Sequence, residues 1–189
     1  MKYSVRTKIL FWLVITIVVM GAFASYFTYT ILTQTLLSLK KESIVVENNN
    51  KVKEFEITLD NIALFAKMLG TRTRVVEYLQ SPISTRKKEL EGIFDVYQKE
   101  NSHYLSIYLM DKTGLTHIST DRSFVGVNYG FRPYFKNAMK GVPTFDIALG
   151  KTTKKLGYYF SHPVEDANGE VLGVLAVKYE PSALFAEIV

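Results

Sequence analysis

The stretch GYYFSHPVEDANGEVLGVLAVKY, residues 157–179, has the pattern of two β-strands joined by a tight turn. Both halves are rich in aromatic and β-branched residues, which favour strands. Between them, Asn168-Gly169 is a dipeptide typical of hairpin turns, because both residues tolerate a positive φ. We therefore predict an antiparallel hairpin with strands over residues 157–164 and 171–179.

The segments before this hairpin extend it into a sheet. Three further strands are expected, over residues 104–110, 115–119 and 145–149. Pro133 suits the first position of a short helix that ends near Met139. Residues 40–100 follow helical spacing instead, so helices precede a mostly antiparallel sheet, which predicts an α+β fold.

An apolar stripe runs along residues 40–79, which contain no proline and a single glycine, Gly70. Its members recur at alternating spacings of three and four, the spacing of one helix face. They are Val45, Asn48, Val52, Phe55, Leu59, Ile62, Ala66 and Leu69. We predict a long stalk helix over residues 37–80 that packs on its own domain, on a second copy of the chain, or on both. A second helix is expected after Ser81-Pro82.

An uncharged run of 31 residues lies between Lys8 and Lys40. Its most apolar part, residues 9–29, spans roughly 30 Å as a helix, which matches the core of a bilayer. The bases of residues 1–8 precede it, so the positive-inside rule places this segment in the cytoplasm. We predict a transmembrane helix over residues 9–36 that carries the rest of the chain to the periplasmic or extracellular side of the cell membrane.

A cleaved signal peptide is the alternative interpretation of the N-terminus. Ala22-Phe23-Ala24 is a small-x-small cleavage pattern after a basic segment and an apolar stretch. We favour the membrane anchor, because the uncharged and helix-compatible run continues to Leu39. Both interpretations export the folded part of the chain.

Composition excludes several classes of chemistry. The chain has no cysteine, which excludes disulfides, Cys-ligated metals and thiol catalysis. The formal net charge is +5, and three of these charges lie in the first 39 residues, so the body lacks the basic face of a nucleic-acid binder. The three histidines are scattered, and Gly150-Lys151-Thr152 lacks the other glycine of a phosphate-binding loop, since position 145 is Phe145. We expect no catalytic residues, metal, cofactor or nucleic acid.

Arg132 is the first candidate for a ligand-binding residue. It lies in the segment YGFRPYF, residues 129–135, among four aromatic side chains. The planar fork of a guanidinium group suits a carboxylate, with two parallel hydrogen bonds. The alternative is an arginine that stacks on aromatic rings and only stabilises the fold.

Two further segments place anion-binding groups in apolar surroundings. On a strand, Tyr159 and Ser161 share one face and offer hydroxyl groups to a ligand. Lys178 lies near the end of a strand that is apolar on both faces, so its ammonium group either reaches the rim or points into a pocket with an anion. An arginine, a lysine and hydroxyls around one cavity would select a small di-anion or a carboxylate.

The residues around these candidates resemble a known family. The segment FVGVNYGFRPYF, residues 124–135, resembles the signature of the double-Cache sensor domains. The match continues through residues 148–150, 157–164 and 169–178, and covers about residues 104–180 in all. The sequence is similar in particular to the four-carbon dicarboxylate sensor histidine kinases.

This resemblance implies a PAS-like antiparallel sheet over residues 81–180, the membrane-distal Cache module, with a small carboxylate in its pocket. The ligand contacts that it implies are Arg132, Tyr134, Thr152, Tyr159, Ser161 and Lys178. Many amino-acid-binding relatives carry a tryptophan beside the arginine, where this chain has Pro133 and Tyr134. The expected ligand is therefore an organic acid, such as a dicarboxylate.

The family normally continues with a second membrane-proximal module, a second transmembrane helix and a cytoplasmic output domain. Residues 181–189 are interpreted as the start of that second module, and we expect no enzymatic activity from this chain itself. The sequence thus predicts the sensing module of a membrane receptor, which forms a homodimer through its long helix. The alternative is a membrane-anchored dimerisation protein without a ligand, whereas no motif supports a secreted hydrolase.

Overall fold

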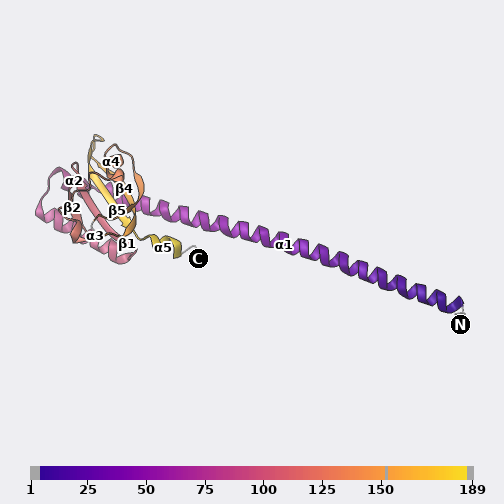
Figure 1. Ribbon diagram of the computed structural model, residues 1–189. Coiled ribbons are helices and arrows are strands. Elements are labelled where there is room, and N and C mark those ends of the chain that lie inside the picture. The colour runs from indigo at the N-terminus through magenta and orange to yellow at the C-terminus, as the bar shows by residue number, and fades with distance from the viewer. Residues whose placement is uncertain (1–4, 152, 187–189) are drawn as a thin grey trace. The chain divides into compact units, whose positions relative to one another are not determined.

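The computed structural model describes residues 5–151 and 153–186 (Figure 1). Its elements in chain order are α1 (Val5–Gly70), α2 (Thr73–Gln80), α3 (Ser84–Glu100), β1 (Tyr104–Asp111), β2 (Thr116–Ser119), the 3-10 helix η1 (Arg122–Phe124), α4 (Pro133–Ala138), β3 (Thr144–Leu149), β4 (Leu156–Glu165), β5 (Val171–Tyr179) and α5 (Pro181–Ala186). The chain divides into two compact units, Met1–Val52 and Lys53–Val189.

The described part of the first unit is helical throughout and belongs to α1. This helix contains a segment long and apolar enough to cross a membrane, and none of that segment is buried within the protein. The predicted membrane helix over residues 9–36 lies inside α1, and no helix break separates it from residue 37 onward. Of the predicted cytoplasmic segment, residues 1–4 lie outside the described part of the chain.

The second unit is built on a five-stranded antiparallel sheet with the strand order β2-β1-β5-β4-β3 (Figure 1). The predicted hairpin is confirmed as β4 and β5, in which Phe160 is opposite Val177. Gly169 in the connecting turn has φ of +82°, a conformation that glycine adopts without strain. The predicted α+β class is also confirmed, and the other expected strands begin or end within about one residue of β1, β2 and β3.

One face of this sheet, which we call the helix face, is covered by the end of α1 together with α2 and α3. From α1, the side chains of Ile62, Ala66 and Leu69 are buried in this core. Phe55 and Leu59 pack against it from their partly buried positions. The C-terminal half of the predicted stripe therefore packs on its own domain, whereas Val45, Asn48 and Val52 are exposed.

The predicted stalk helix over residues 37–80 is wrong at its C-terminal end, because α1 ends at Gly70 and α2 is a separate helix. Two local features end α1 here. The hydroxyl of Thr71 donates to the carbonyl oxygen of Lys67 at 2.9 Å and so satisfies one of the free carbonyls of the last turn. A side chain at Gly70 would lie 3.3 Å from Nδ1 of His162, so glycine lets the helix end approach β4 closely.

The opposite face, which we call the α4 face, has its own buried cluster. Aromatic rings dominate it, including Tyr108, Phe124, Tyr129 and Tyr134. These rings come from β1, from η1, from the loop after it and from α4, so the loop and α4 lie over this face.

The last described element, α5, packs on the same module. Ala183 and Leu184 of this helix are buried in the helix-face core. Residues 187–189 lie outside the described part of the chain. The interpretation of residues 181–189 as the start of a second module stays a prediction.

The packing of the helix face predicts different effects for two apolar side chains. Leu69 of α1 is fully buried and Val96 of α3 is 52% exposed. Leu69→Ala should lower the free energy of unfolding by about 2–5 kcal/mol, because it leaves a cavity in the core. Val96→Ala should change it by less than about 0.5 kcal/mol. Urea unfolding of the full chain in mild detergent, followed by circular dichroism, measures both, and equal effects would contradict the packing described.

Candidate functional site

Four polar side chains form one row across the strands. Ser106 of β1 is opposite Lys178 of β5. Lys178 is in turn opposite Tyr159 of β4, and Tyr159 is opposite Asp146 of β3. Directly opposite residues share a face of the sheet, and Tyr159 belongs to the α4-face cluster. The row therefore lies on the α4 face.

Lys178 is the buried cation of this row, with only 1% of its surface exposed. Its Nζ donates to the hydroxyl of Thr153 at 2.7 Å and lies 5.7 Å from the ring centre of Tyr159. It forms no ion pair within the part of the chain that the structure describes. Burial lowers the pKa of Lys178; Lys155 and Arg132 lower it further, whereas Asp121 acts in the opposite direction.

Two glycines make room for the Lys178 side chain. A Cβ atom at Gly157 would lie 2.4 Å from Cε of Lys178 and 3.0 Å from its Cγ, so the aliphatic stem crosses β4 over this glycine. A Cβ atom at Gly150 would lie 3.1 Å from Nζ. The ammonium group is thus directed to the loop between β3 and β4.

A cavity of about 220 Å³ lies beside Lys178. Its polar lining comes from Ser106, Asp121, Thr153, Lys155 and Lys178, and the remaining lining is apolar. Ser106 is 1% exposed, and its Oγ has no hydrogen-bond partner within residues 5–151 and 153–186. Since a buried hydroxyl normally finds a partner, this group marks the cavity as a place for a polar ligand.

Arg132 precedes the first residue of α4 and is half-buried. Its Nη2 donates to the carbonyl oxygen of Leu149 at 2.7 Å, and its Cζ lies 5.0 Å from the ring centre of Phe131. It does not line the 220 Å³ cavity, yet its charge is close enough to lower the pKa of Lys178. The charges of the two predicted cations, Arg132 and Lys178, therefore act on each other. The alternative interpretation, an arginine that stacks on an aromatic ring, agrees with the contact between Arg132 and Phe131.

The predicted contacts Tyr134 and Tyr159 stack on each other, with ring centres 5.1 Å apart and planes 5° from parallel. The hydroxyl of Tyr134 accepts a hydrogen bond from Tyr108 at 2.8 Å, which leaves its own proton for another acceptor. Burial raises the pKa of Tyr159 to about 12 and also raises the pKa of Tyr134. Both phenols are therefore neutral donors at neutral pH.

Two further predicted site residues are Ser161 and Thr152. Ser161 is on the α4 face, but its hydroxyl donates to the carbonyl oxygens of Tyr134 at 3.0 Å and Thr144 at 3.2 Å, which ties α4 and β3 to β4. It does not line the cavity beside Lys178. Thr152 lies outside the described residues. The hydroxyl of its neighbour Thr153 accepts the hydrogen bond from the ammonium group of Lys178. The ligand-contact role of both residues stays a prediction.

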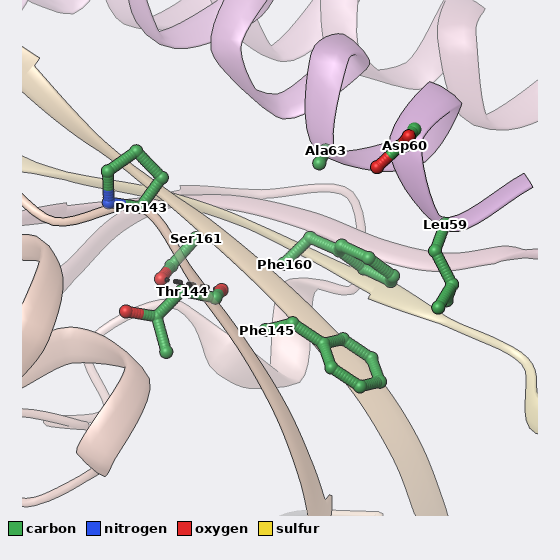
Figure 2. A pocket seen from close by; sticks show the side chains of 8 residues that line it. All are labelled: Leu59, Asp60, Ala63, Pro143, Thr144, Phe145, Phe160 and Ser161. Carbon is green, nitrogen blue, oxygen red and sulfur yellow. Dashed lines mark hydrogen bonds between the residues drawn. The ribbon is translucent and has the colours of Figure 1, made fainter. Parts of the chain in front are cut away.

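A larger cavity of about 320 Å³ lies on the other side of the sheet, between α1 and the edge formed by β3 and β4. Figure 2 shows Leu59, Asp60 and Ala63 from the helix above Phe145 and Phe160. None of its lining residues is a cation, and a carboxylate there would face the carboxylate of Asp60. This apolar cavity does not suit an anionic ligand.

Sequence reasoning missed four residues that line the charged cavity: Ser106, Asp121, Thr153 and Lys155. Ser106 is placed opposite Lys178 by an irregularity in β1 between Tyr104 and Ser106, which no local pattern reveals. The sequence does indicate a fixed position for the Asp121 side chain, because an aspartate often accepts a hydrogen bond from the backbone two residues later, here from Ser123.

Comparison with curated proteins finds sensor proteins. The chain is 30% identical over 129 residues to the C4-dicarboxylate transport sensor protein DctB of Pseudomonas aeruginosa, a match that covers 65% of this chain and 21% of that protein. It is 36% identical over 78 residues to DctB of Rhizobium meliloti, a match that covers 39% of this chain and 12% of that protein. The chain thus spans about a fifth or less of the length of these relatives. No family model matches it.

Comparison with solved structures finds sensor domains. The V. cholerae histidine kinase DctB sensor domain matches with a TM-score of 0.66 and 29% identity, over 78% of this chain and 60% of that chain. The E. coli DcuS sensor domain matches in fold, with a TM-score of 0.57 and 21% identity, over 71% and 98%. A ligand-binding domain of the Campylobacter jejuni chemoreceptor Tlp3 also shares the fold, with a TM-score of 0.57 and 14% identity, over 73% and 56%.

The buried ammonium group predicts that the ligand-free protein becomes more stable when the charge is removed. Lys178→Met keeps the length of the stem and removes a cation that has no counter-ion, so the free energy of unfolding should rise by roughly 1 kcal/mol or more. The control is Lys112→Met, an exposed lysine paired with Glu170, which should change it by less than about 1 kcal/mol. Urea unfolding without ligand measures both, and a clear loss of stability in Lys178→Met would contradict the prediction.

The stability gain in Lys178→Met should also depend on pH. The folded state lowers the pKa of Lys178 from 10.5, so between the lowered value and 10.5 the unfolded chain binds more protons than the folded one. Stability of the unsubstituted protein therefore rises with pH across this window, as the buried group loses its charge. The stability gap between the two proteins should narrow as the pH rises toward 10.5, and a constant gap would contradict the assignment.

Proposed function

We propose that this chain, which carries a PAS-like Cache sensor domain related to those of the C4-dicarboxylate sensor proteins, is the ligand-sensing part of a membrane signal-transduction receptor. In this proposal a small carboxylate, such as a dicarboxylate or another organic acid, binds on the α4 face near Lys178 and Arg132. The two cations carry the recognition, and Tyr134 and Tyr159 supply neutral donors.

The observation that carries this proposal is that Lys178 and Arg132 both donate hydrogen bonds to neutral oxygen atoms. The ammonium group of Lys178 donates to a hydroxyl of Thr153, and the guanidinium group of Arg132 donates to the carbonyl oxygen of Leu149. Both partners are neutral and belong to the end of β3 and the loop after it. A carboxylate would replace them with charge-assisted hydrogen bonds, which are roughly twice as strong as neutral ones.

Signal relay follows from the alternation of the central strands. Lys178 and Tyr159 lie on the α4 face, whereas their neighbours Val177 and Phe160 lie in the helix-face core. That core also contains Leu69 of α1. A ligand with different affinities for two arrangements of β4 and β5 would favour one of them, and with it one arrangement of α1 against the sheet. Such a difference in affinity is required for any signal.

The proposed location is a bacterial cell membrane, with the N-terminus in the cytoplasm and the sensor domain in the periplasm or outside the cell. Three observations support it. The α1 helix contains a segment suited to a membrane span. Basic residues precede that segment. The matched curated relatives are C4-dicarboxylate transport sensor proteins.

A second candidate function is dimerisation through the long helix. The predicted stripe is partly used by the domain itself, since Leu59 packs against its core. Ile57, Leu64 and Met68 remain exposed on α1, at spacings of seven and four residues. This spacing places the three side chains along one helix face, where a second copy of the chain would bury them.

The receptor proposal predicts a ligand response that depends on Arg132. Small carboxylates should stabilise the full chain in detergent by about 2.7 kcal/mol at 100 times the dissociation constant, seen as a higher melting temperature. Arg132→Ala should abolish this shift while the domain stays folded, because the side chain is half-buried and bonds only to one carbonyl and one ring.

The matched control for this experiment is Arg86→Ala. Arg86 is a half-buried arginine of α3 that lies 3.7 Å from Glu77 and does not line the cavity beside Lys178. It should keep the full ligand shift. An unchanged shift in Arg132→Ala would reject the assignment of Arg132, and no shift with any small carboxylate would reject the carboxylate receptor.

The dimer proposal predicts that Leu64→Lys converts a dimer of the full chain in detergent to a monomer, because a charge enters the exposed row. The change should leave the domain folded, since Leu64 is exposed. Val142→Lys, at another exposed apolar residue, is the control and should keep the dimer. Light scattering after gel filtration measures the mass, and a dimer that survives Leu64→Lys would argue against this interface.

A further inference from the structure

We propose that the ligand carries a hydroxyl group beside its carboxylate, so that the site binds 2-hydroxy acids in preference to the corresponding acids without the hydroxyl. This inference rests on the proposed carboxylate site and names the chemistry of its ligand more closely. It comes from two lining groups that a plain carboxylate does not satisfy, Ser106 and Asp121.

The first of these groups is the hydroxyl of Ser106. It is buried and has no hydrogen-bond partner among the residues that the structure describes, and Ser106 is directly opposite Lys178 in the sheet. Ser106 and Lys178 line the same cavity, so a ligand bound beside the ammonium group of Lys178 shares that cavity with the hydroxyl of Ser106. Leaving a buried hydroxyl unpaired is unfavourable, so the hydrogen-bonding capacity of this group remains for the ligand.

The second group is the carboxylate of Asp121. Its Oδ1 accepts hydrogen bonds from the backbone nitrogen of Ser123 at 3.1 Å and from its hydroxyl at 2.6 Å. Its Oδ2 accepts none from the residues that the structure describes. Asp121 acts on the pKa of Lys178 but forms no ion pair with it, so its charge is felt across the cavity and not by contact.

These groups discriminate between classes of acid. A carboxylate is only an acceptor of hydrogen bonds, so a ligand oxygen without a proton would meet Asp121 with repulsion. A 2-hydroxy acid directs its carboxylate to Lys178 and the exposed Lys155, and its hydroxyl donates to Asp121 while it accepts from Ser106. A 2-amino acid also donates to Asp121, but it adds a positive charge beside the two lysines.

The size of the cavity agrees with a small metabolite. Its volume of about 220 Å³ is below the roughly 300–1,000 Å³ typical of pockets for drug-sized ligands. The ligand class is therefore a short 2-hydroxy acid with a few carbon atoms.

The test compares matched acids on the full chain in detergent by isothermal titration calorimetry. Malate and succinate differ only in the hydroxyl, as do lactate and propionate. We expect the hydroxy acid of each pair to bind at least about tenfold more tightly, the effect of a hydrogen bond to a charged group. Asp121→Asn and Ser106→Ala should each reduce this ratio, because each removes a group that distinguishes the hydroxy acid from the plain acid.

Ser119→Ala is the matched control. Ser119 is also a buried serine whose Oγ has no partner, but it does not line this cavity. Removal of the Ser119 hydroxyl should leave the affinities for the hydroxy acid and for the plain acid unchanged. Ser106→Ala should leave the ligand-free melting temperature unchanged or higher, because it removes an unsatisfied buried group, so a loss of binding is not mistaken for unfolding.

Each other outcome is informative. Equal affinity for malate and succinate would overturn the hydroxyl inference and leave the carboxylate receptor intact. Binding of neither acid, or of any related carboxylate, would overturn both proposals. Tighter binding of aspartate than of malate would replace the hydroxy acid with an amino acid, and a ratio unchanged by Ser106→Ala and Asp121→Asn would remove both residues from the site.

Discussion

An ammonium group withdrawn from water needs a negative partner. The buried ammonium group of Lys178 has a neutral partner instead, the hydroxyl of Thr153, and no ion pair with the residues that the structure describes. Much of the surrounding structure serves this placement. Gly157 and Gly150 leave space for the side chain, and the ring of Tyr159 lies beside its charge. The domain therefore retains a charge that destabilises the ligand-free fold, and a bound anion would compensate it. Binding sites often lower the stability of the free protein in this way.

The sheet lies between the charged site and the helices. Its α4 face carries polar groups in one row, whereas its helix face carries a core shared with the end of α1. Because the strands that carry the candidate site also contribute to that core, a ligand bound as proposed would affect α1 through packed side chains. Ser161 adds rigidity here, since its hydroxyl ties α4 and β3 to β4.

Local patterns predicted the central part of the fold. The alternation and the Asn168-Gly169 turn gave the correct hairpin, because both signals depend on neighbouring residues. The end of α1 at Gly70 was missed, because α2 continues the apolar spacing with its buried Val75 and Tyr78. Periodicity alone does not distinguish one helix from two that pack on the same core.

The lining of the candidate site was predicted only in part for a related reason. Lys178 and Tyr159 were chosen as candidates because a strand assigns each residue to a face, and the structure places both on the α4 face. Ser106 and Asp121 were not identified, because their positions depend on the register between β1 and β5 and on the path of a loop. Contacts between distant segments follow from the folded structure and leave little trace in the local sequence.

The alternation of β5 restricts how the length of this protein can change during evolution. Val177, Lys178 and Tyr179 point to the two faces in turn, so one residue inserted within β5 would send Val177 to the charged cavity and Lys178 into the apolar core. Insertions in the turn that contains Gly169 carry no such penalty, because they precede β5 and leave its alternation unchanged, and the space around Gly169 is open. Homologues should therefore vary in length at this turn and keep the spacing within β5 constant.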